Sequence, residues 1–223
     1  MMVPMDLYDV MRTTSAVREY TGDPLPDDVL ERILDNARFS PSGGNRQGNR
    51  VIAVRNSQTR EALIKLTVPA TQRYIAQLRN GESPWNPLRP CRVDAETIAK
   101  VDVPDRSPMR TAAVVLVVCV DLEVVAAFDQ DLDRVGLIAG ASVYPFVWNI
   151  LLAARNEGYG GVLTTNIVAA EPQVRELLAI PDNYAIAAVL PLGKPKKQIT
   201  RLTRKPVAEI ATTERFDGAP LGG

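Results

Sequence analysis

The segment VGLIAGASVYPFVWNILLAA, residues 135–154, most limits what this chain can fold into, because so many apolar side chains in a row must be hidden from water. Its length and apolarity match those of a membrane span, but Ser142, Pro145 and Asn149 interrupt it and no other segment indicates a membrane protein. A helix that is apolar all round is otherwise buried in a large core or a subunit interface. We therefore expect a buried helix that kinks at Pro145, where a backbone donor is missing.

The size and balance of the chain favour one domain. Its 223 residues, 46% of them hydrophobic, suffice for one large domain or two small ones, and no linker or repeat divides them, so we expect a single domain over 1–223. The 26 basic and 26 acidic residues cancel, which gives no overall attraction to nucleic acid or an anionic membrane. The start MMVPMDLYDVMRTTS is not a secretory signal, and only two cysteines occur. These features predict a cytoplasmic protein.

The chain contains no histidine. This absence removes the Ser-His-Asp triad, the Cys-His dyad and the common zinc sites, and without a Cys-x-x-Cys pair we expect no metal site. The sequence has neither a G-x-x-x-x-G-K-[ST] loop nor a G-x-G-x-x-G motif after a strand. Chemistry carried by a cofactor therefore fits the sequence better than chemistry carried by side chains.

The periodicity of apolar residues predicts alternating helices and strands. Helices are expected over 6–12, 26–38, 57–65 and 171–180, and strands at 51–54, 112–120 and 185–193. The stretch EGYGGVLTT predicts a glycine-rich turn into a short strand. Alternation of this kind by itself favours a parallel α/β sheet.

Residues 69–110 form the least regular part of the chain, because prolines recur through it around two short helical patterns near 70–80 and 94–100. A long irregular segment inside a compact domain is usually a lid or a binding loop, or else is disordered.

Two further segments have the composition of ligand sites. The loop FSPSGGNRQGNR, residues 39–50, combines flexible glycines with amide side chains, so it could wrap a flat polar ligand or simply form a helix-to-strand turn. The tract 194–205 carries six cations and no acid, so it could bind a phosphate or form a solvated surface tail.

The order of these segments resembles the FMN-dependent nitroreductase family. The most specific pieces are the block A-x-x-SPSGGN-x-Q and the block NILLAARNEGYG, which is followed at the right distance by a strand ending in Leu-Gly-Lys-Pro. The resemblance spans about residues 6–210, apart from 69–110.

The resemblance implies an α+β fold, a three-layer α/β/α sandwich around a mixed, mostly antiparallel sheet. It also implies a domain-exchanged homodimer with FMN in clefts at the subunit interface, and it assigns the apolar helix at 135–154 to that interface. Residues 69–110 would be a lid-like insertion, and the extension at about 194–223 would reach over the partner subunit.

Carried over position by position, the resemblance assigns cofactor contacts to several parts of the chain. Arg18 corresponds to a contact with the ribityl phosphate, as does Arg204, with Arg201 and Lys205 as neighbours. The loop residues that would line the flavin ring from the other subunit are Pro41, Ser42, Gly43 and Asn45, with Gln47 as a further contact. The strand from Gly161 to Thr165 would place backbone donors near the reactive ring, where they stabilise negative charge on reduction, through Gly161, Val162, Leu163 and Thr164.

The chain departs from the family pattern at two places. The family often has Arg-x-Ser-x-Arg at the N-terminal phosphate site, whereas this chain keeps only the last cation, Arg18. Either Arg12 substitutes from one turn earlier or phosphate binding depends more on the C-terminal tract. The glutamine expected late in the long helix is Trp148, beside Asn149.

The resemblance implies ping-pong transfer of hydride from NAD(P)H, with NADPH favoured, through FMN to nitroaromatic or quinone-like acceptors. The flavin carries the chemistry, so no side chain is assigned a catalytic role. Tyr74 and Trp85 are candidates to line the substrate pocket, although ordinary loop packing explains them as well. Arg79, Arg89 or Arg92 could recognise a 2′-phosphate.

Other functions also fit the sequence. Relatives with this fold dehalogenate aromatic substrates, dehydrogenate amino-acid-derived rings or destroy their own flavin. A flavin-binding protein without turnover and an FMN-free interaction protein are further alternatives.

Overall fold

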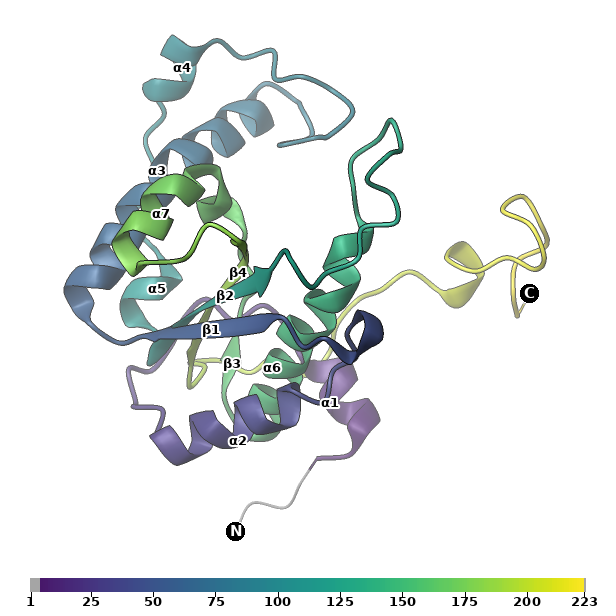
Figure 1. Cartoon of the computed structure of the whole chain (residues 1–223), viewed down its shortest axis with the longest axis horizontal. Helices are drawn as coiled ribbons and strands as arrows, with labels where there is room; N and C mark the ends of the chain where they lie inside the picture. The colour runs from purple at the N-terminus through teal and green to yellow at the C-terminus, as the bar shows by residue number, and fades with distance from the viewer. Residues whose placement is uncertain (1–4, 223) are drawn as a thin grey trace.

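The computed structural model describes residues 5–222 and shows a four-stranded sheet between two layers of helices (Figure 1). The strand order is β1-β2-β4-β3, and the strands are β1 (Asn49–Val54), β2 (Val114–Asp121), β3 (Gly160–Gly161) and β4 (Tyr184–Gly193). All three strand pairs are antiparallel, and one isolated bridge between Ala16 and Gly161 is parallel. The mixed, mostly antiparallel α+β sandwich is confirmed.

The prediction of a parallel sheet is wrong, because the chain between β1 and β2 runs out along one helix and then returns beside it. The helix α3 (Ser57–Arg79) leads away from the end of β1, and the segment that follows runs back along it. Gln72 on α3 donates from Nε2 to the backbone O of Val101 at 3.1 Å, and Glu61 near its start bonds Arg110 at 2.6 Å. The chain therefore enters β2 beside the end of β1, and the two strands are antiparallel.

The helices cover both faces of the sheet. Figure 1 shows α1, α2 and α6 on one side and α3, α5 and α7 on the other. The other helices are α1 (Leu7–Thr13), α2 (Asp27–Ala37), α4 (Ala95–Ala99), α5 (Pro108–Thr111), α6 (Tyr144–Asn156) and α7 (Glu171–Leu178). The predicted helices at 6–12, 26–38 and 171–180 are confirmed, and so is the one near 94–100.

The central strand β2 is buried on both faces. Its alternate residues Val114, Leu116 and Val118 pack with α2 and α6, whereas Val115 and Val117 pack with α3 and α7. Side chains alternate between the two faces of a strand, so a strand covered on both sides must be apolar throughout. The uninterrupted apolar run at residues 112–120 is thus explained by the central position of β2 in the middle layer.

The expected helix at 135–154 is wrong in its first nine residues. Residues Ile138–Ser142 form a short 3₁₀ turn, and α6 begins only at Tyr144, with Pro145 in its first turn. Proline is tolerated there because the first N–H groups of a helix have no partner within the helix, so Pro145 starts α6 rather than kinking it. Within residues 5–222, none of the helices combines the length and the apolarity that crossing a bilayer requires.

The irregular segment is shorter than expected. The helix predicted at 57–65 continues through Pro69 to Arg79, so residues 69–79 belong to α3. Pro69 is exposed, and Asn56 caps the start of the helix by accepting the N–H of Thr59 at 3.0 Å. Packing of the apolar face of α3 on the sheet offsets the single donor that Pro69 removes.

Candidate functional site

A cavity of about 700 Å³ lies between α3 and the segment after β3. Four residues predicted for the site, Arg18, Tyr74, Trp85 and Thr164, line it together. We call it the aromatic cavity; its lining is completed by Ala70, Thr71, Thr165, Asn166, Val168 and Ala169. Arg18 is the one charged residue in this lining, so the cavity combines flat aromatic walls with a single positive charge.

A second cavity of about 450 Å³ adjoins the aromatic cavity, and Thr71, Thr164 and Asn166 line both. Asn166 donates from Nδ2 to Oγ1 of Thr71 at 3.2 Å, which ties the two walls together. The far side of this second cavity is the segment 101–109, including Arg106. Sequence reasoning missed Arg106 and Asn166; the directly preceding GGVLTT motif was the signal available for Asn166.

The segment from Gly161 to Thr164 is held tightly against β4. A Cβ at Gly161 would lie 2.3 Å from Cδ2 of Leu192 and 2.6 Å from the backbone O of Pro191, so only glycine fits. The predicted strand is shorter than expected, because only Gly160–Gly161 pairs continuously and Thr164 forms an isolated bridge with Val189. Both the N–H and Oγ1 of Thr164 donate to Val189 O, so Thr164 forms a wall of the cavity while its own donors are used within the sheet.

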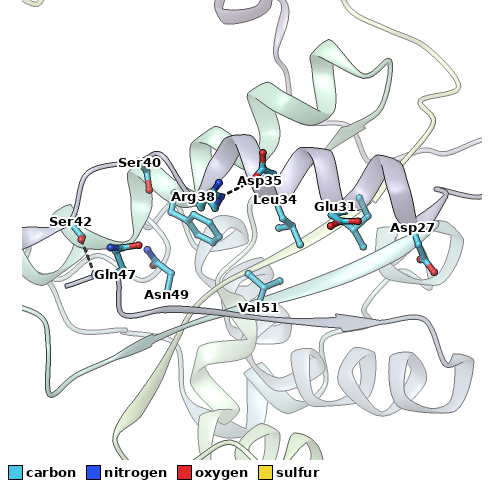
Figure 2. A pocket seen from close by; sticks show the side chains of 12 residues that line it. Asp27, Glu31, Leu34, Asp35, Arg38, Ser40, Ser42, Gln47, Asn49 and Val51 are labelled. Carbon is cyan, nitrogen blue, oxygen red and sulfur yellow. Dashed lines mark hydrogen bonds and ion pairs between the residues drawn. The ribbon is translucent and has the colours of Figure 1, made fainter. Parts of the chain in front are cut away.

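The glycine-rich loop between α2 and β1 has a fixed conformation. Gly44, Asn45 and Gln47 have φ values of 61°, 55° and 51°, in the left-handed region. Ser42 Oγ accepts the N–H of Gln47 at 3.0 Å, as Figure 2 shows, and Ser142 Oγ accepts the N–H of Gly43 at 3.1 Å. The side chains of Asn45 and Gln47 are left exposed.

Figure 2 shows the groove beside this loop, where α2 faces β1 across a space of about 600 Å³. Ser42 and Gln47 lie at one end of it, and a row of acids on α2, Asp27, Glu31 and Asp35, lines its rim. Pro41 and Gly43 line a separate, smaller cavity of about 330 Å³, together with residues of the turn before α6. Among the described residues, none that lines either space also lines the aromatic cavity, so one chain keeps the loop and Arg18 apart.

The predicted C-terminal cations also lie apart from the aromatic cavity. Arg201 and Arg204 are exposed, and Arg204 donates to the backbone O of Thr203 at 2.7 Å. Lys205 pairs with Glu209 at 3.7 Å. Figure 1 shows the tail leaving the body of the molecule, and none of these three residues lines the aromatic cavity.

The remaining candidate cations are spread over other parts of the surface. The guanidinium of Arg12 lies 5.9 Å from the centre of the Tyr8 ring on α1, and Arg12 does not line the aromatic cavity. Arg92 pairs with Glu82 at 3.6 Å, Arg89 lines a small separate cavity, and Arg79 is exposed at the end of α3. The structure thus brings none of them to the aromatic cavity.

The fold and the site together define a class of protein. In an α+β sandwich without histidine in its sequence, a cavity lined by two aromatic side chains and one cation fits chemistry carried by a bound cofactor better than chemistry carried by side chains. The chain belongs to the Nitroreductase family, whose family model matches residues 11–194. At the level of the family, it is a flavoprotein oxidoreductase.

Three similar proteins illustrate the range of this family. An iodotyrosine deiodinase of Nematostella vectensis is 27% identical over 92% of this chain and 74% of its own length. A putative NADH dehydrogenase/NAD(P)H nitroreductase of Methanothermobacter thermautotrophicus is 28% identical over 86% of this chain and 78% of its own length. The solved NADPH:FMN oxidoreductase from Vibrio harveyi complexed with NAD+ shares the fold with a TM-score of 0.68, at 20% identity over 96% of this chain and 80% of that one.

Proposed function

We propose that this protein is an FMN-dependent oxidoreductase that passes hydride from NAD(P)H, with NADPH favoured, to nitroaromatic or quinone-like acceptors by a ping-pong mechanism. The observation that carries the proposal is the meeting of Arg18, Tyr74, Trp85 and Thr164 around one cavity. The similarity to an NAD(P)H nitroreductase and to an NADPH:FMN oxidoreductase supports it.

The residues around the aromatic cavity fit FMN. Arg18 supplies a positive charge for an anionic cofactor, and aromatic side chains flank a volume of about 700 Å³. Oγ of Ser15 is buried and has no hydrogen-bond partner among the described residues, and Ser15 directly precedes Ala16, which bridges to Gly161. This orphaned buried hydroxyl lies three residues before Arg18 in the sequence, and such a group is a ready contact for an oxygen-rich cofactor.

FMN, when bound, supplies the transfer of hydride between NAD(P)H and the acceptor. The role of the chain itself is to bind and orient the cofactor and the acceptor. Arg18 offsets negative charge, Thr164 forms a rigid wall, and Tyr74 and Trp85 favour flat rings and exclude water. No side chain is assigned as a general acid or base.

We also propose a domain-exchanged homodimer that completes the site. One chain keeps the loop residues Pro41 to Gln47 away from the aromatic cavity, and its tail leaves the body after Gln198, whose Nε2 still donates to the backbone O of Thr13 (Figure 1). Tyr144 and Trp148 on α6 are 45% and 43% exposed, one turn apart, beside an α1 that also exposes Tyr8. A second copy that covers this apolar face would bring its Ser42, Gly43 and Asn45, and the basic tail with Arg201 and Arg204, toward the flavin.

The first experiment is the visible spectrum of the purified protein, followed by anaerobic addition of NADPH and then of a nitroaromatic. A yellow protein that bleaches with NADPH and recolours with acceptor supports the proposal. A protein that stays colourless after incubation with FMN would refute it, and one that holds FMN but never bleaches would be a flavin-binding protein without turnover.

Two variants test the assigned contacts. We expect Arg18→Ala and Arg204→Ala each to raise the Kd for FMN about tenfold, as loss of a charge-assisted hydrogen bond does. In Arg204→Ala, the Kd for riboflavin, which lacks the phosphate, should stay the same as in the native protein. Arg215→Ala is the matched control, because Arg215 lies in the same tail and pairs with Asp217 at 2.9 Å.

Dehalogenation of an iodinated tyrosine is the second candidate function, favoured by the similarity to an iodotyrosine deiodinase. The lining of the aromatic cavity has no carboxylate among the described residues that could bind the ammonium group of an amino acid. We therefore rank this function second, and turnover of 3-iodotyrosine by the reduced protein, at a rate above that with a nitroaromatic, would reverse the order.

A further inference from the structure

The segment between α3 and α4 presents Trp85 to the aromatic cavity in an unusual backbone conformation. Trp85 has a φ of 51°, in the left-handed region that a bulky residue rarely adopts, and the residue is 43% exposed. A residue is held in such a conformation only when its surroundings fix it. The contacts around Trp85 must therefore hold it in this conformation.

Three contacts fix Trp85, and all come from α3. Its backbone N–H donates to Oε1 of Gln77 at 3.1 Å, and its indole Nε1 donates to the backbone O of Ala70 at 3.3 Å. The guanidinium of Arg73 lies over the ring, 4.1 Å from its centre. With one face covered by Arg73 and the indole N–H bonded, the ring keeps one orientation at the cavity.

The orientation of Gln77 is in turn set by Glu82. The side chain of Glu82 is only 7% exposed, and its carboxylate accepts hydrogen bonds from Nε2 of Gln77 at 3.0 Å and from Nδ2 of Asn80 at 2.7 Å. The backbone N–H of Arg92 also donates to it, at 3.3 Å. Because Glu82 holds the NH₂ group of Gln77, the amide oxygen of Gln77 faces the N–H of Trp85.

We infer that Trp85 is a specificity-determining residue for flat aromatic acceptors and that Glu82, acting through Gln77, is its positioning residue. This inference rests on the proposed function and names a wall of the same site. A ring that cannot rotate provides a stacking surface without losing side-chain freedom on binding. A small inorganic acceptor such as ferricyanide takes electrons without stacking, so it does not depend on this wall.

The test compares two acceptors, a nitroaromatic and ferricyanide, with NADPH as reductant. For Trp85→Ala we expect kcat/KM for the nitroaromatic to fall about tenfold, mainly through KM, because a stacking surface is lost. Ferricyanide reduction should stay within about twofold of the native rate, since it needs no stacking. Trp85→Phe keeps a ring and should recover most of the loss.

The variant Glu82→Gln tests the positioning role. An amide in place of the carboxylate turns one acceptor into a donor that faces the donors of Gln77 and Asn80. We therefore expect kcat/KM for the nitroaromatic, divided by kcat/KM for ferricyanide, to fall about threefold or more. Glu96→Gln is the matched control, since Glu96 lies on the following helix α4, at an exposed position, and its carboxylate pairs with the exposed Lys100 at 2.5 Å.

A spectroscopic measurement separates positioning from a general loss of structure. The chain has two tryptophans, so in a Trp148→Phe background the fluorescence reports Trp85 alone. We expect Glu82→Gln to shift this emission to longer wavelength, and Glu96→Gln to leave it unchanged. An unchanged emission and acceptor ratio in Glu82→Gln would overturn the role of Glu82, and an equal loss for both acceptors in Trp85→Ala would overturn that of Trp85.

The failure of this inference is distinguishable from failure of the proposed function. Bleaching of the flavin by NADPH is measured first in every variant. If the native protein does not bleach, the proposed function fails and this inference fails with it. If every variant bleaches normally and the acceptor ratio does not move, only the inference about Trp85 and Glu82 fails.

Discussion

The backbone N–H of Gly43 donates a hydrogen bond to Oγ of Ser142 at 3.1 Å and joins the glycine-rich loop to the turn before α6. The backbone O of Ser142 accepts a second bond, from Nδ2 of Asn49 at 3.3 Å, at the other end of the same loop. Ser142 is largely buried in the 3₁₀ turn Ile138–Ser142, so it holds the loop from a fixed position. The left-handed residues Asn45 and Gln47 lie between the two contacts, which offset the cost of their conformation.

Replacing Ser142 by alanine should loosen this loop while leaving the fold intact. The loss of one hydrogen bond corresponds to about 1 kcal/mol in the free energy of unfolding, and we expect the Kd for FMN to rise about fivefold. Equilibrium unfolding in urea and FMN titration measure the two effects. Ser57→Ala at the exposed start of α3 is the control, and an unaltered Kd in Ser142→Ala would show that the loop does not contact the cofactor.

The fit of Gly161 against β4 leads to a second prediction. A Cβ at Gly161 would lie 2.3 Å from the side chain of Leu192, so Gly161→Ala should reduce the free energy of unfolding by about 1–3 kcal/mol. A Cβ at Gly136 would find no neighbour closer than 3.9 Å, so Gly136→Ala should have almost no effect. Urea denaturation of both variants checks the difference, and equal stabilities would contradict the packing argument.

Local periodicity predicted most of the elements, because the apolar faces of α2 and β2 must be buried wherever the chain goes. It could not predict the direction of the strands. That direction depends on how residues 80–111 return along α3, through contacts such as Gln72 with Val101 and Glu61 with Arg110. These pairs join residues far apart in the sequence, and no local pattern encodes them.

Four residues of the candidate site were predictable from the sequence, on two different grounds. Arg18 and Thr164 came from the family resemblance, and Tyr74 and Trp85 from their place in an irregular segment; the structure brings these four together. Glu82 was not predictable, because its role arises from a folded-back loop whose donors converge on one carboxylate. The separation of the loop 41–47 from Arg18 is likewise a property of the whole fold.

The two cysteines should differ in reactivity. Burial raises the pKa of the Cys119 thiol to about 11, and Cys119 is enclosed within β2. Cys91 is half-buried in the segment before α4, and both thiols are free. A thiol reagent such as DTNB at pH 8 should therefore modify one cysteine in the native protein and both in urea, because the thiolate is the reacting form. In Cys91→Ser the native protein should be unreactive; rapid labelling there would contradict the burial of Cys119.

The loop from β2 to the 3₁₀ turn should lose its order in acid through Asp129. Its carboxylate accepts the N–H of Leu137 at 2.7 Å and that of Ile138 at 3.3 Å, and it pairs with Arg134 at 2.8 Å. These contacts hold the pKa of Asp129 below its ordinary value of 3.8, with the bond from Leu137 as the largest cause. Since the pKa is lowered on folding, the stabilisation is complete above that ordinary value and is lost as the pH falls through the lowered one.

Amide hydrogen exchange at Leu137 and Ile138 measures this loss directly. We expect protection of both amides to be constant from neutral pH to about pH 5 and to fall below the ordinary Asp129 pKa, after correction for the intrinsic exchange rate. Asp129→Asn should lower the protection already at pH 7, because a neutral amide accepts these bonds more weakly and cannot pair with Arg134. Asp131→Asn, at an exposed position in the same loop, is the control. If Asp129→Asn leaves both amides protected, backbone contacts alone hold the loop and its order should not respond to this carboxylate.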